Sequence, residues 1–593
     1  MTLRILATSL ALVVACGAYA ANAANAAEAD PQETKTLHSL FNVQWETLAQ
    51  RFPEFATYRG DYRYNDRLSD VSPEAIAAFD RETRGWLAQA EALRRDRLGA
   101  TDRVSLDMFI GARRREVALQ AYPGYRSLGL GALGGVQTQV SQLLQVAPVN
   151  NVLQVEQLLQ RLAAYPKRMD QEIGNLRRGM ALGYVSSKDV LERVLAQIDA
   201  QLAPAVEAGP FWGPFQRMGK DIPAEQRGRL QAAGRESIAQ NVLPSLRKLR
   251  TFVADEYLPK APANGALGNY PDGSKLYDEV VRQQTTTNLT AAEVHAIGQR
   301  ELKRLRGEME TVMRETKFDG DFAAFVLFLN TDPKFFHKSP EALLAGYRDI
   351  AKRIDAELPR LFVELPRAPY GIRAMPAHLG ADRAEYYDGP ARDGTRAGYF
   401  NANAAGWQKK PIWGMATLVA HEAVPGHHLQ IARNTELGAL PEFRRGSFGY
   451  TAFTEGWALY AETLGNEIGL YDDPYSRFGH LQWQAFRAAR LVVDTGIHAL
   501  GWRRQQAIDF MTERTGVDRG FVSAEVDRYT SNAGQALAYM IGELKILELR
   551  ERAKARLGAK YELRRFNNAV IDNGALPLDT LERLMDEWIA AQP

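Results

Sequence analysis

Apolar residues recur at every third or fourth position along most of the chain, which is the spacing of helices that bury one face. The pattern is dense between residues 72 and 257, where strong helix-forming residues dominate. One such run consists of Leu153, Val155, Leu158, Leu159 and Leu162. Thr290 and Glu293 have the spacing of a capping box and precede a further long repeat of this kind. We therefore predict a mostly helical protein.

Two interruptions divide this helical pattern. Residues 259–265 contain two prolines, an asparagine and a glycine, so we expect a boundary there. It would separate an N-terminal helical lobe, residues 27–258, from a C-terminal helical lobe, residues 266–593. Residues 365–412 are rich in proline, glycine, tyrosine and arginine, and residues 397–401 resemble a strand. We expect a small β segment in that region.

The first residues have the composition of a targeting segment. Arg4 supplies a positive charge, and residues 5–15 are apolar but too few to span a bilayer. Small-residue cleavage patterns follow at residues 18–20 and 21–23, so we expect a signal peptide over residues 1–26. Residues 13–16 also resemble a lipobox, in which case the signal ends before Cys16 and Cys16 carries a lipid anchor. Either ending predicts a periplasmic or secreted protein.

The remaining composition narrows the class of protein. Cys16 is the only cysteine, so we expect a mature fold without disulfide bonds that depends on core packing. Lysine and arginine together number 73, and aspartate and glutamate number 71. This balance gives no reason to expect nucleic acid or an anionic membrane as a partner. No later run is long and apolar enough to predict a transmembrane helix.

Three of the nine histidines, His421, His427 and His428, lie within eight residues, and Glu422 directly follows the first. Zinc proteases use two helical histidines to bind Zn²⁺ and an adjacent glutamate to deprotonate a metal-bound water. The second histidine is normally at i+4, but that position is Pro425 here. On a straight helix His428 would lie about 10 Å along the axis from His421, too far to share an ion. We therefore expect a distortion that brings His427 or His428 back to His421.

The third ligand is expected from a later helix. An apolar stripe at helical spacing predicts a packed helix there, formed by Phe453, Trp457, Tyr460, Leu464 and Ile468. Glu455 lies off this stripe and is the candidate third ligand. Glu462 lies two turns further along the same flank, where it could support a ligand.

The two segments resemble a known bacterial family. His-Glu-x-x-Pro-Gly-His-His-x-Gln, followed by Thr-Glu-Gly-Trp-Ala-Leu-Tyr-Ala-Glu, is similar to the family catalogued as domain of unknown function 885. The resemblance covers nearly the whole mature chain and includes residues 52–57, 393–398, 494–498 and 528–542. That family is regarded as related to the gluzincin metallopeptidases. More distantly, the segments are similar to the carboxypeptidase Taq, thimet oligopeptidase and angiotensin-converting enzyme families.

This resemblance implies a two-lobed helical metallopeptidase-like fold around a deep channel, with a zinc site in the C-terminal, catalytic lobe. Aligning the Gly-His pairs of the related motifs implies that His421, His427 and Glu455 bind Zn²⁺. Glu422 would then be the general base. Residues 539–542 resemble the tyrosine helix of the related peptidases, which makes Tyr539 the first candidate to stabilise the oxyanion.

Further candidates follow from residue type. His498 and Tyr529 are the next choices as donors near the reacting carbonyl, and Tyr529 could also contact substrate. Tyr399 and its neighbours could form an edge strand that hydrogen-bonds an extended peptide. Three arginines could pair with a substrate carboxylate: Arg528, Arg487 and Arg490.

The sequence predicts zinc-dependent hydrolysis of peptide bonds, in short or unfolded peptides. One alternative is a zinc hydrolase of a specialised amide, such as a cell-wall peptide or an amino-acid conjugate. Another is a non-catalytic peptide-binding protein with a vestigial metal site, although such a protein has no need of Glu422 as a base. A serine or cysteine hydrolase is disfavoured, because Cys16 lies in the targeting segment and no nucleophile elbow is present.

Overall fold

The computed structural model describes residues 29–132, 134–375, 384–391, 394, 396–438, 440–445 and 450–592. The expected signal segment and Cys16 lie outside these residues, as do residues 393 and 395 of the family-like motif. Most of the described chain is helical, and three short strands form one small sheet. The prediction of a mostly helical protein with a small β segment near residues 365–412 is confirmed.

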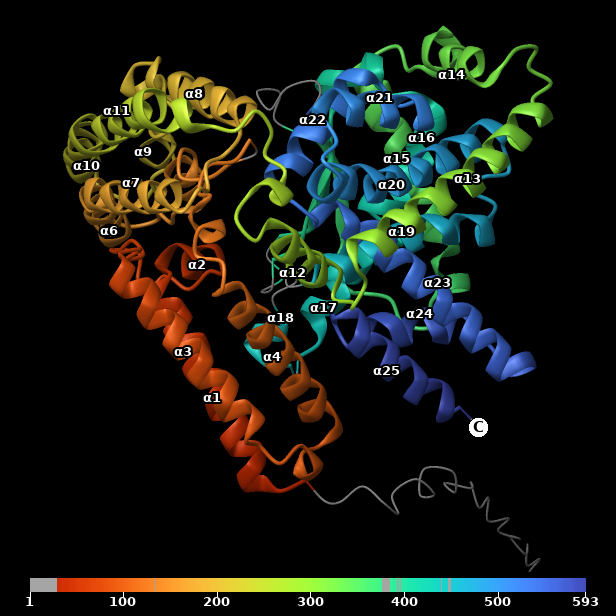
Figure 1. Ribbon diagram of the computed structural model, residues 1–593, viewed down its shortest axis with the longest axis horizontal. Coiled ribbons are helices and arrows are strands. Elements are labelled where there is room, and N and C mark those ends of the chain that lie inside the picture. Colours follow the sequence, from red (N-terminus) through yellow and green to blue (C-terminus); the bar gives the residue numbers. More distant parts are fainter. Residues whose placement is uncertain are drawn as a thin grey trace, which may run out of the picture.

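A first group of helices occupies the left side of Figure 1, coloured red to yellow. Proline and capping side chains begin several of them: the Asp30 carboxylate accepts the backbone N–H groups of Gln32 and Glu33 at the start of the first. Their bounds are α1 Pro31–Arg51, α2 Pro53–Tyr58, α3 Pro73–Glu91, α4 Ala100–Leu119, α5 Gln139–Val146, α6 Val152–Ala163, α7 Tyr165–Ala181, α8 Lys188–Leu202, α9 Gly213–Gln216, α10 Ala224–Ser237 and α11 Leu243–Phe252.

A second group, green to blue, lies at the right of Figure 1. The capping box expected at Thr290 and Glu293 is present at the start of its second helix. The helix bounds are α12 Gly273–Thr285, α13 Ala291–Glu315, α14 Phe322–Thr331, α15 Pro340–Leu361, α16 Ile412–Glu422, α17 His427–Glu436, α18 Glu442–Arg445, α19 Thr451–Leu464, α20 Pro474–Leu500, α21 Arg504–Thr515, α22 Arg519–Ser531, α23 Ala538–Leu557, α24 Leu563–Ile571 and α25 Leu578–Ala590.

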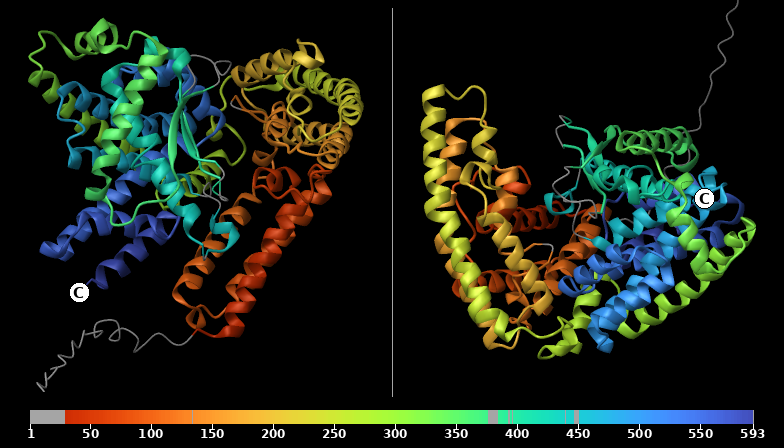
Figure 2. Two further views of the ribbon diagram at one scale, coloured as in Figure 1. Left: turned by 180° about the vertical axis from the view of Figure 1, so that it is seen from behind. Right: turned by 90° about the horizontal axis from the view of Figure 1, so that it is seen from above.

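Two large hydrophobic clusters underlie these groups. One consists of buried residues between Leu130 and Tyr257. The larger one runs from Ala266 to Ile589 and also includes Val104, Met108 and Tyr184. A third, smaller cluster joins buried residues of α1, α3 and α4. The change of cluster falls in the stretch expected to separate two lobes, and the exact domain bounds stay a prediction. Figure 2 shows the two groups from behind and from above, side by side in both views.

The three strands are β1 Tyr370–Ala374, β2 Tyr386–Asp388 and β3 Gly398–Ala402, in the order β1-β3-β2. β3 pairs in parallel with β1 and antiparallel with β2, so strands occupy both of its edges. The prediction of an edge strand at Tyr399 is therefore wrong, because a central strand has no free edge for a peptide. The two edge strands of the sheet are β1 and β2.

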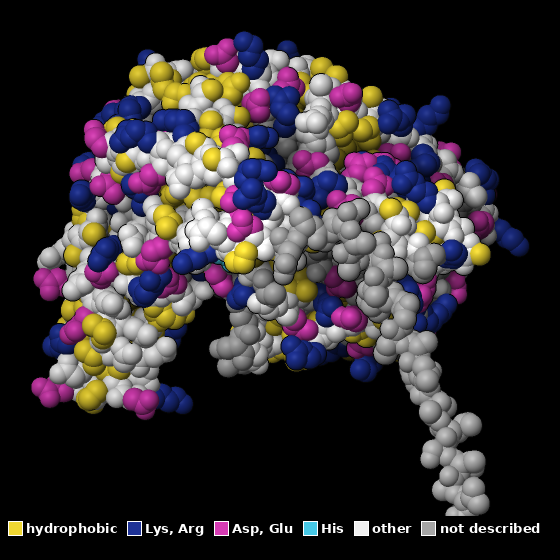
Figure 3. Space-filling view, turned by 90° about the horizontal axis from the view of Figure 1, so that it is seen from below, with side chains coloured by type: hydrophobic (Ala, Val, Ile, Leu, Met, Phe, Trp, Pro, Cys, Tyr) yellow, Lys and Arg dark blue, Asp and Glu magenta, His cyan; other side chains and the backbone are white. Residues whose placement is uncertain are grey.

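None of the described helices is both long enough and apolar enough to cross a membrane. Basic and acidic side chains are interspersed over the face seen in Figure 3, in keeping with the nearly equal numbers of the two in the sequence.

Candidate metal centre

The helix that carries His421 and Glu422 ends directly after them. α16 stops at Glu422, Ala423 leaves the helical conformation with φ −102° and ψ −106°, and α17 begins at His427. The expected distortion is therefore a complete break between two helices, with a cis peptide bond at Val424–Pro425.

Two contacts define this break. A Cβ atom at Gly426 would lie 1.9 Å from the carbonyl oxygen of His421, so only glycine lets the chain pass this close to the end of α16. The indole Nε1–H of Trp457, on α19, donates a 3.0 Å hydrogen bond to the carbonyl oxygen of Pro425. The helix of the expected third ligand therefore also holds the break between the two histidine helices.

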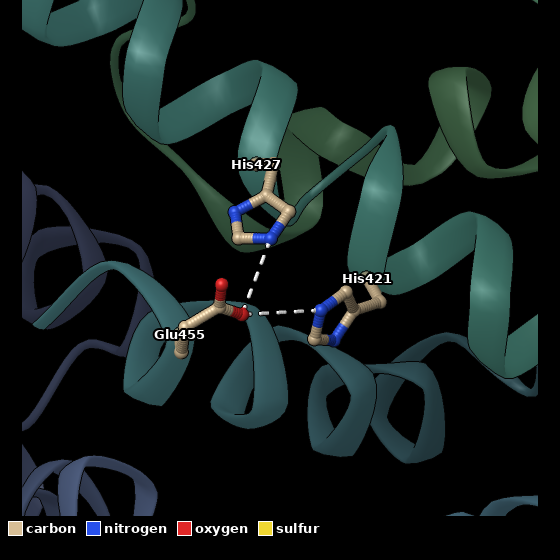
Figure 4. A group of neighbouring side chains, drawn as sticks. All are labelled: His421, His427 and Glu455. Atoms are coloured by element: carbon tan, nitrogen blue, oxygen red, sulfur yellow. Dashed lines mark ion pairs between the residues drawn. The ribbon is translucent and has the colours of Figure 1, made fainter. Parts of the chain in front are cut away.

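The break brings His427 back towards His421, and Glu455 of α19 reaches both (Figure 4). Oε2 of Glu455 lies 3.5 Å from Nε2 of His421 and 3.4 Å from Nε2 of His427. One ligand atom from each of these three residues lies within 4.8 Å of the others. These are the three residues that the family resemblance implies as ligands, whereas the residues alone leave His427 and His428 both open.

His428 points away from this cluster. Its Nδ1 lies 2.7 Å from the hydroxyl of Tyr387 on β2, and its ring packs 4.6 Å from that of Tyr370 on β1. Burial lowers the pKa of His428 to about 4, so the ring is a neutral link between α17 and the sheet. Of the two histidines that the sequence left open, the break thus brings His427, and not His428, to Glu455.

Glu462 supports His421 from behind. Its Oε1 lies 2.8 Å from Nδ1 of His421 and accepts a 3.1 Å hydrogen bond from Nη2 of Arg487. The Glu462 side chain is fully buried. A proton on Nδ1 directs the lone pair of Nε2 towards Glu455, which is the arrangement of a metal-binding imidazole held by a carboxylate.

A close helix crossing positions Glu455. α19 and α23 pass each other at Gly456 and Gly542, where an added Cβ on Gly542 would lie 1.8 Å from the carbonyl oxygen of Ala452. Both glycines belong to the sequence segments that resemble the family. Gly456 directly follows Glu455, and Gly542 lies three positions after Tyr539. The crossing therefore brings Glu455 and Tyr539 close together.

Glu422 is almost completely buried, and burial raises the pKa of its carboxyl group to about 8. The positive charge of a protonated His427 acts in the opposite direction, whereas the neighbouring carboxylates of Glu455 and Glu385 raise the pKa further. A cation between the three ligand atoms would favour the ionised carboxylate.

Tyr539 lies in the first turn of α23, below the guanidinium group of Arg490, whose carbon is 4.4 Å from the centre of the tyrosine ring. Burial and the charge of Glu455 raise the pKa of Tyr539 above its usual value. Its hydroxyl is therefore protonated at neutral pH and can donate a hydrogen bond.

A cavity of about 470 Å³ borders the centre. His421, Glu422 and Tyr539 line one part of it, and apolar side chains line another. All the residues that line it belong to α14–α23 or to the segments between them, so this cavity lies within the second group of helices. The expected channel between two lobes stays a prediction. The apolar lining includes Met415, Leu418, Trp483, Val517 and Phe521.

His498 is not brought to the centre. The backbone N–H of Leu267 donates a 3.0 Å hydrogen bond to its Nδ1, and its Nε2 lies 3.0 Å from the carbonyl oxygen of Tyr529. Both ring nitrogens are thus bonded to the main chain, and the side chain is buried. This corrects the assignment of His498 as a catalytic residue, since it joins segments of the core.

Tyr529 and Arg528 lie behind Arg490. The Tyr529 hydroxyl accepts a 3.0 Å hydrogen bond from Nε of Arg490 and donates one of 2.9 Å to Glu525, which also pairs with Arg528. Neither residue lines the described part of the cavity. This corrects their assignment as substrate contacts, because the Tyr529 hydroxyl is bonded to Arg490 and Glu525, and Arg528 is paired with Glu525 and Gln535.

Sequence reasoning missed three residues of this region, Glu385, Lys410 and Glu525. Glu385 and Lys410 form a 2.8 Å ion pair at the cavity wall, and Glu525 pairs with both Arg490 and Arg528. None of them has a ligand-like spacing to the histidine motif, so only the fold reveals them.

Comparisons with known proteins find matches that cover nearly the whole chain. A family model described as "Bacterial protein of unknown function (DUF885)" matches residues 53–585. The structure of a putative lipoprotein from Colwellia psychrerythraea is similar with a TM-score of 0.88 and 28% identity, over 94% of this chain and 100% of that chain. A putative lipoprotein of unknown function from Shewanella oneidensis shares the fold with a TM-score of 0.75 and 17% identity, over 93% and 99% of the two chains. No curated protein matches the sequence.

Proposed function

We propose that this chain, which belongs to the DUF885 family of bacterial proteins of unknown function, catalyses zinc-dependent hydrolysis of peptide bonds in short or unfolded peptides. One observation carries the proposal. Two imidazole nitrogens and a carboxylate oxygen converge beside a buried glutamate at the wall of a cavity. Two histidines, a glutamate and an open position are the ligand set of many catalytic zinc sites.

Two of the three separations between the ligand atoms fit zinc, and the third is at most 4.8 Å. Ligands about 2.0–2.1 Å from a tetrahedral ion lie about 3.3–3.4 Å from one another. Oε2 of Glu455 lies 3.5 Å and 3.4 Å from the two histidine nitrogens. The same oxygen is buried and has no hydrogen-bond partner in the part of the chain that the structure describes. Such an atom is costly to bury unless a ligand satisfies it.

Zn²⁺ bound by His421, His427 and Glu455 would supply a Lewis acid that polarises a carbonyl group and lowers the pKa of water. Glu422 then accepts the proton of the attacking water and delivers it to the leaving amine. Tyr539 donates a hydrogen bond to the oxygen that gains negative charge. Water adds across the amide, so that one C–N bond breaks, one C–O bond forms and the amine leaves with a proton.

The cavity favours a small or extended substrate. A space of about 470 Å³ holds one or a few side chains, which suits short or unfolded peptides better than folded proteins. The same set of ligands and base supports the relationship to gluzincin metallopeptidases that the sequence motifs imply.

The proposed place of action is outside the cytoplasm, in the periplasm or the medium. The apolar N-terminal segment supports export. Two proteins that share the fold are described as putative lipoproteins, which favours the alternative in which Cys16 carries a lipid anchor.

The test is incubation of zinc-loaded mature protein with a mixture of short peptides, followed by mass spectrometry of the products. A chelator-treated sample and the Glu422→Gln variant are the controls. Peptide cleavage that both controls lose supports the proposal. Absence of cleavage by protein that retains zinc contradicts it, and would move attention to a specialised amide or to peptide binding alone.

A further inference from the structure

Two buried arginines form one wall of the cavity beside the candidate centre. Arg487 and Arg490 extend from α20, one helical turn apart, and both line the cavity with His421, Glu422 and Tyr539. Their exposed fractions are 6% and 7%. Side chains at i and i+3 lie on the same face of a helix, so both guanidinium groups face the same space.

Each arginine is only partly paired. Arg487 donates through Nη2 to Glu462, and Arg490 donates through Nε to Tyr529 and through Nη2 to Glu525. Nε and Nη1 of Arg487 and Nη1 of Arg490 are buried without a hydrogen-bond partner among the described residues, although both guanidinium groups lie over aromatic rings. A buried, charged N–H group without an acceptor is costly, so these groups form a ready site for an anion.

The local charge agrees with an anion site. Three guanidinium groups, those of Arg487, Arg490 and Arg528, share two carboxylates, Glu462 and Glu525. Among these five groups, of which Arg487 and Arg490 line the cavity, one positive charge is left over. An Arg–carboxylate pair is a strong, directional contact in a buried setting.

The position of the arginines limits which carboxylate they can bind. Arg487 hydrogen-bonds Glu462, which hydrogen-bonds His421. Two hydrogen bonds span about 6 Å, and one extended residue spans at most about 3.6 Å. The guanidinium carbon of Arg490 also lies 4.4 Å from the ring centre of Tyr539, the candidate oxyanion donor, so a carboxylate bound by the arginines would lie within a few residues of a peptide bond held at the centre. Trp483 and Phe521 are among the apolar residues that line the same cavity, and Lys410 and Asp518 are among its charged ones.

We propose that Arg487 and Arg490 bind the C-terminal carboxylate of a peptide, and that the protein is an exopeptidase that releases one or two residues from the C-terminus. The apolar lining residues favour an apolar side chain on the terminal residue. This inference rests on the proposed peptidase function and specifies its substrate. Hydrolysis of the last or second-last peptide bond consumes one water and yields a shortened peptide with a new carboxylate and a free amino acid or dipeptide.

The test compares matched substrates on the unaltered protein. A peptide that ends in phenylalanine is offered as the free acid and as the C-terminal amide, to zinc-loaded protein. The inference predicts release of one or two C-terminal residues from the acid, and a kcat/KM about 10- to 100-fold lower for the amide, the value of one or two charge-assisted hydrogen bonds. Equal rates for acid and amide, or cleavage at internal bonds only, would overturn the inference while leaving a peptidase.

Variants then assign the discrimination to the arginines. Arg490→Gln and Arg487→Gln are each expected to reduce the acid-to-amide ratio towards one. The matched control is Arg550→Gln, because Arg550 is similarly buried but pairs with Glu467 elsewhere in the fold. A ratio that stays high in both cavity variants, with circular dichroism spectra like that of the unaltered protein, contradicts a carboxylate site at these arginines.

A binding measurement separates this inference from the proposed function. Calorimetry with the Glu422→Gln variant compares N-acetylphenylalanine with its amide. Tighter binding of the acid, lost when Arg490→Gln is added, supports the carboxylate site even where no peptide is cleaved. Equal binding of acid and amide, or none of either, overturns it.

Discussion

Nδ1 of His421 lies 2.8 Å from Oε1 of Glu462, and this contact fixes which ring nitrogen faces the other candidate ligands. Glu462 lies two turns after Glu455 on α19, so one helix supplies both a candidate ligand and the group that orients another. Arg487 holds the far side of the same carboxylate.

Replacing Glu462 with glutamine should therefore weaken zinc binding. Loss of such a supporting carboxylate typically lowers metal affinity by about 10- to 100-fold, and we expect a change of that size in competition with a chromogenic chelator. Glu543→Gln is the control, since Glu543 is also buried but no hydrogen bond joins it to His421 in the described structure. Equal zinc affinities for the two variants would contradict this role of Glu462.

Replacing Glu422 with glutamine should separate metal binding from chemistry. The amide keeps the shape of the side chain but cannot accept the proton of the attacking water, a contribution of about 10²- to 10⁴-fold. We expect kcat/KM for peptide hydrolysis to fall by that factor while zinc content stays unchanged. A variant that keeps more than a tenth of the activity would exclude Glu422 as the base.

The glycine crossing between α19 and α23 should not tolerate a methyl group. In Gly542→Ala the new Cβ would meet the carbonyl oxygen of Ala452, and overpacking of this kind costs about 1–3 kcal/mol. We expect the free energy of unfolding to fall by that amount in urea titrations. Gly85→Ala on α3 is the control, because its Cβ meets nothing within 4 Å and alanine favours a helix. Similar losses in both variants would contradict the crossing as the cause.

Glu543 should make stability depend on pH. Burial, assisted by the charge of Glu462, raises the pKa of Glu543 to about 8 from 4.5. The folded state therefore holds a proton that the unfolded state releases, so its contribution is complete below about pH 4.5 and is lost as the pH rises through 8. In Glu543→Gln this decrease in the free energy of unfolding with rising pH, at most about 1.4 kcal/mol per pH unit, should be absent.

Urea titrations of chelator-treated protein between pH 5.5 and 8 test this dependence. The unaltered chain should lose stability more steeply with rising pH than the variant. Parallel curves for the two proteins would show that Glu543 is ionised in the folded state.

The local sequence indicated the candidate ligands but not all of their geometry. The position of Pro425 indicated that the helix after His421 is distorted, and the spacing of apolar residues indicated that Glu455 leaves the packed face. The selection of His427 over His428 depends on contacts across the chain, the approach of Gly426 to His421 and the bond from Trp457 to Pro425. No local pattern records such contacts.

The wrong expectations have a similar cause. His498 is a polar residue on a buried helix, but its partners, the backbone groups of Leu267 and Tyr529, lie 231 and 31 residues away. Tyr399 does lie on a strand, yet the order of strands in a sheet is set by pairing that period-two patterns do not specify.

The zinc content of the purified chain and of two neighbouring variants, measured by mass spectrometry of the metal, is a direct test of the proposed centre. We predict that the unaltered protein and His428→Gln each hold a single Zn²⁺ ion, and that His427→Gln loses it. His428→Gln is the matched control, since its side chain faces Tyr387 and the sheet. Unaltered protein that takes up no zinc, or His427→Gln that keeps it while His428→Gln loses it, would contradict a metal centre at His421, His427 and Glu455.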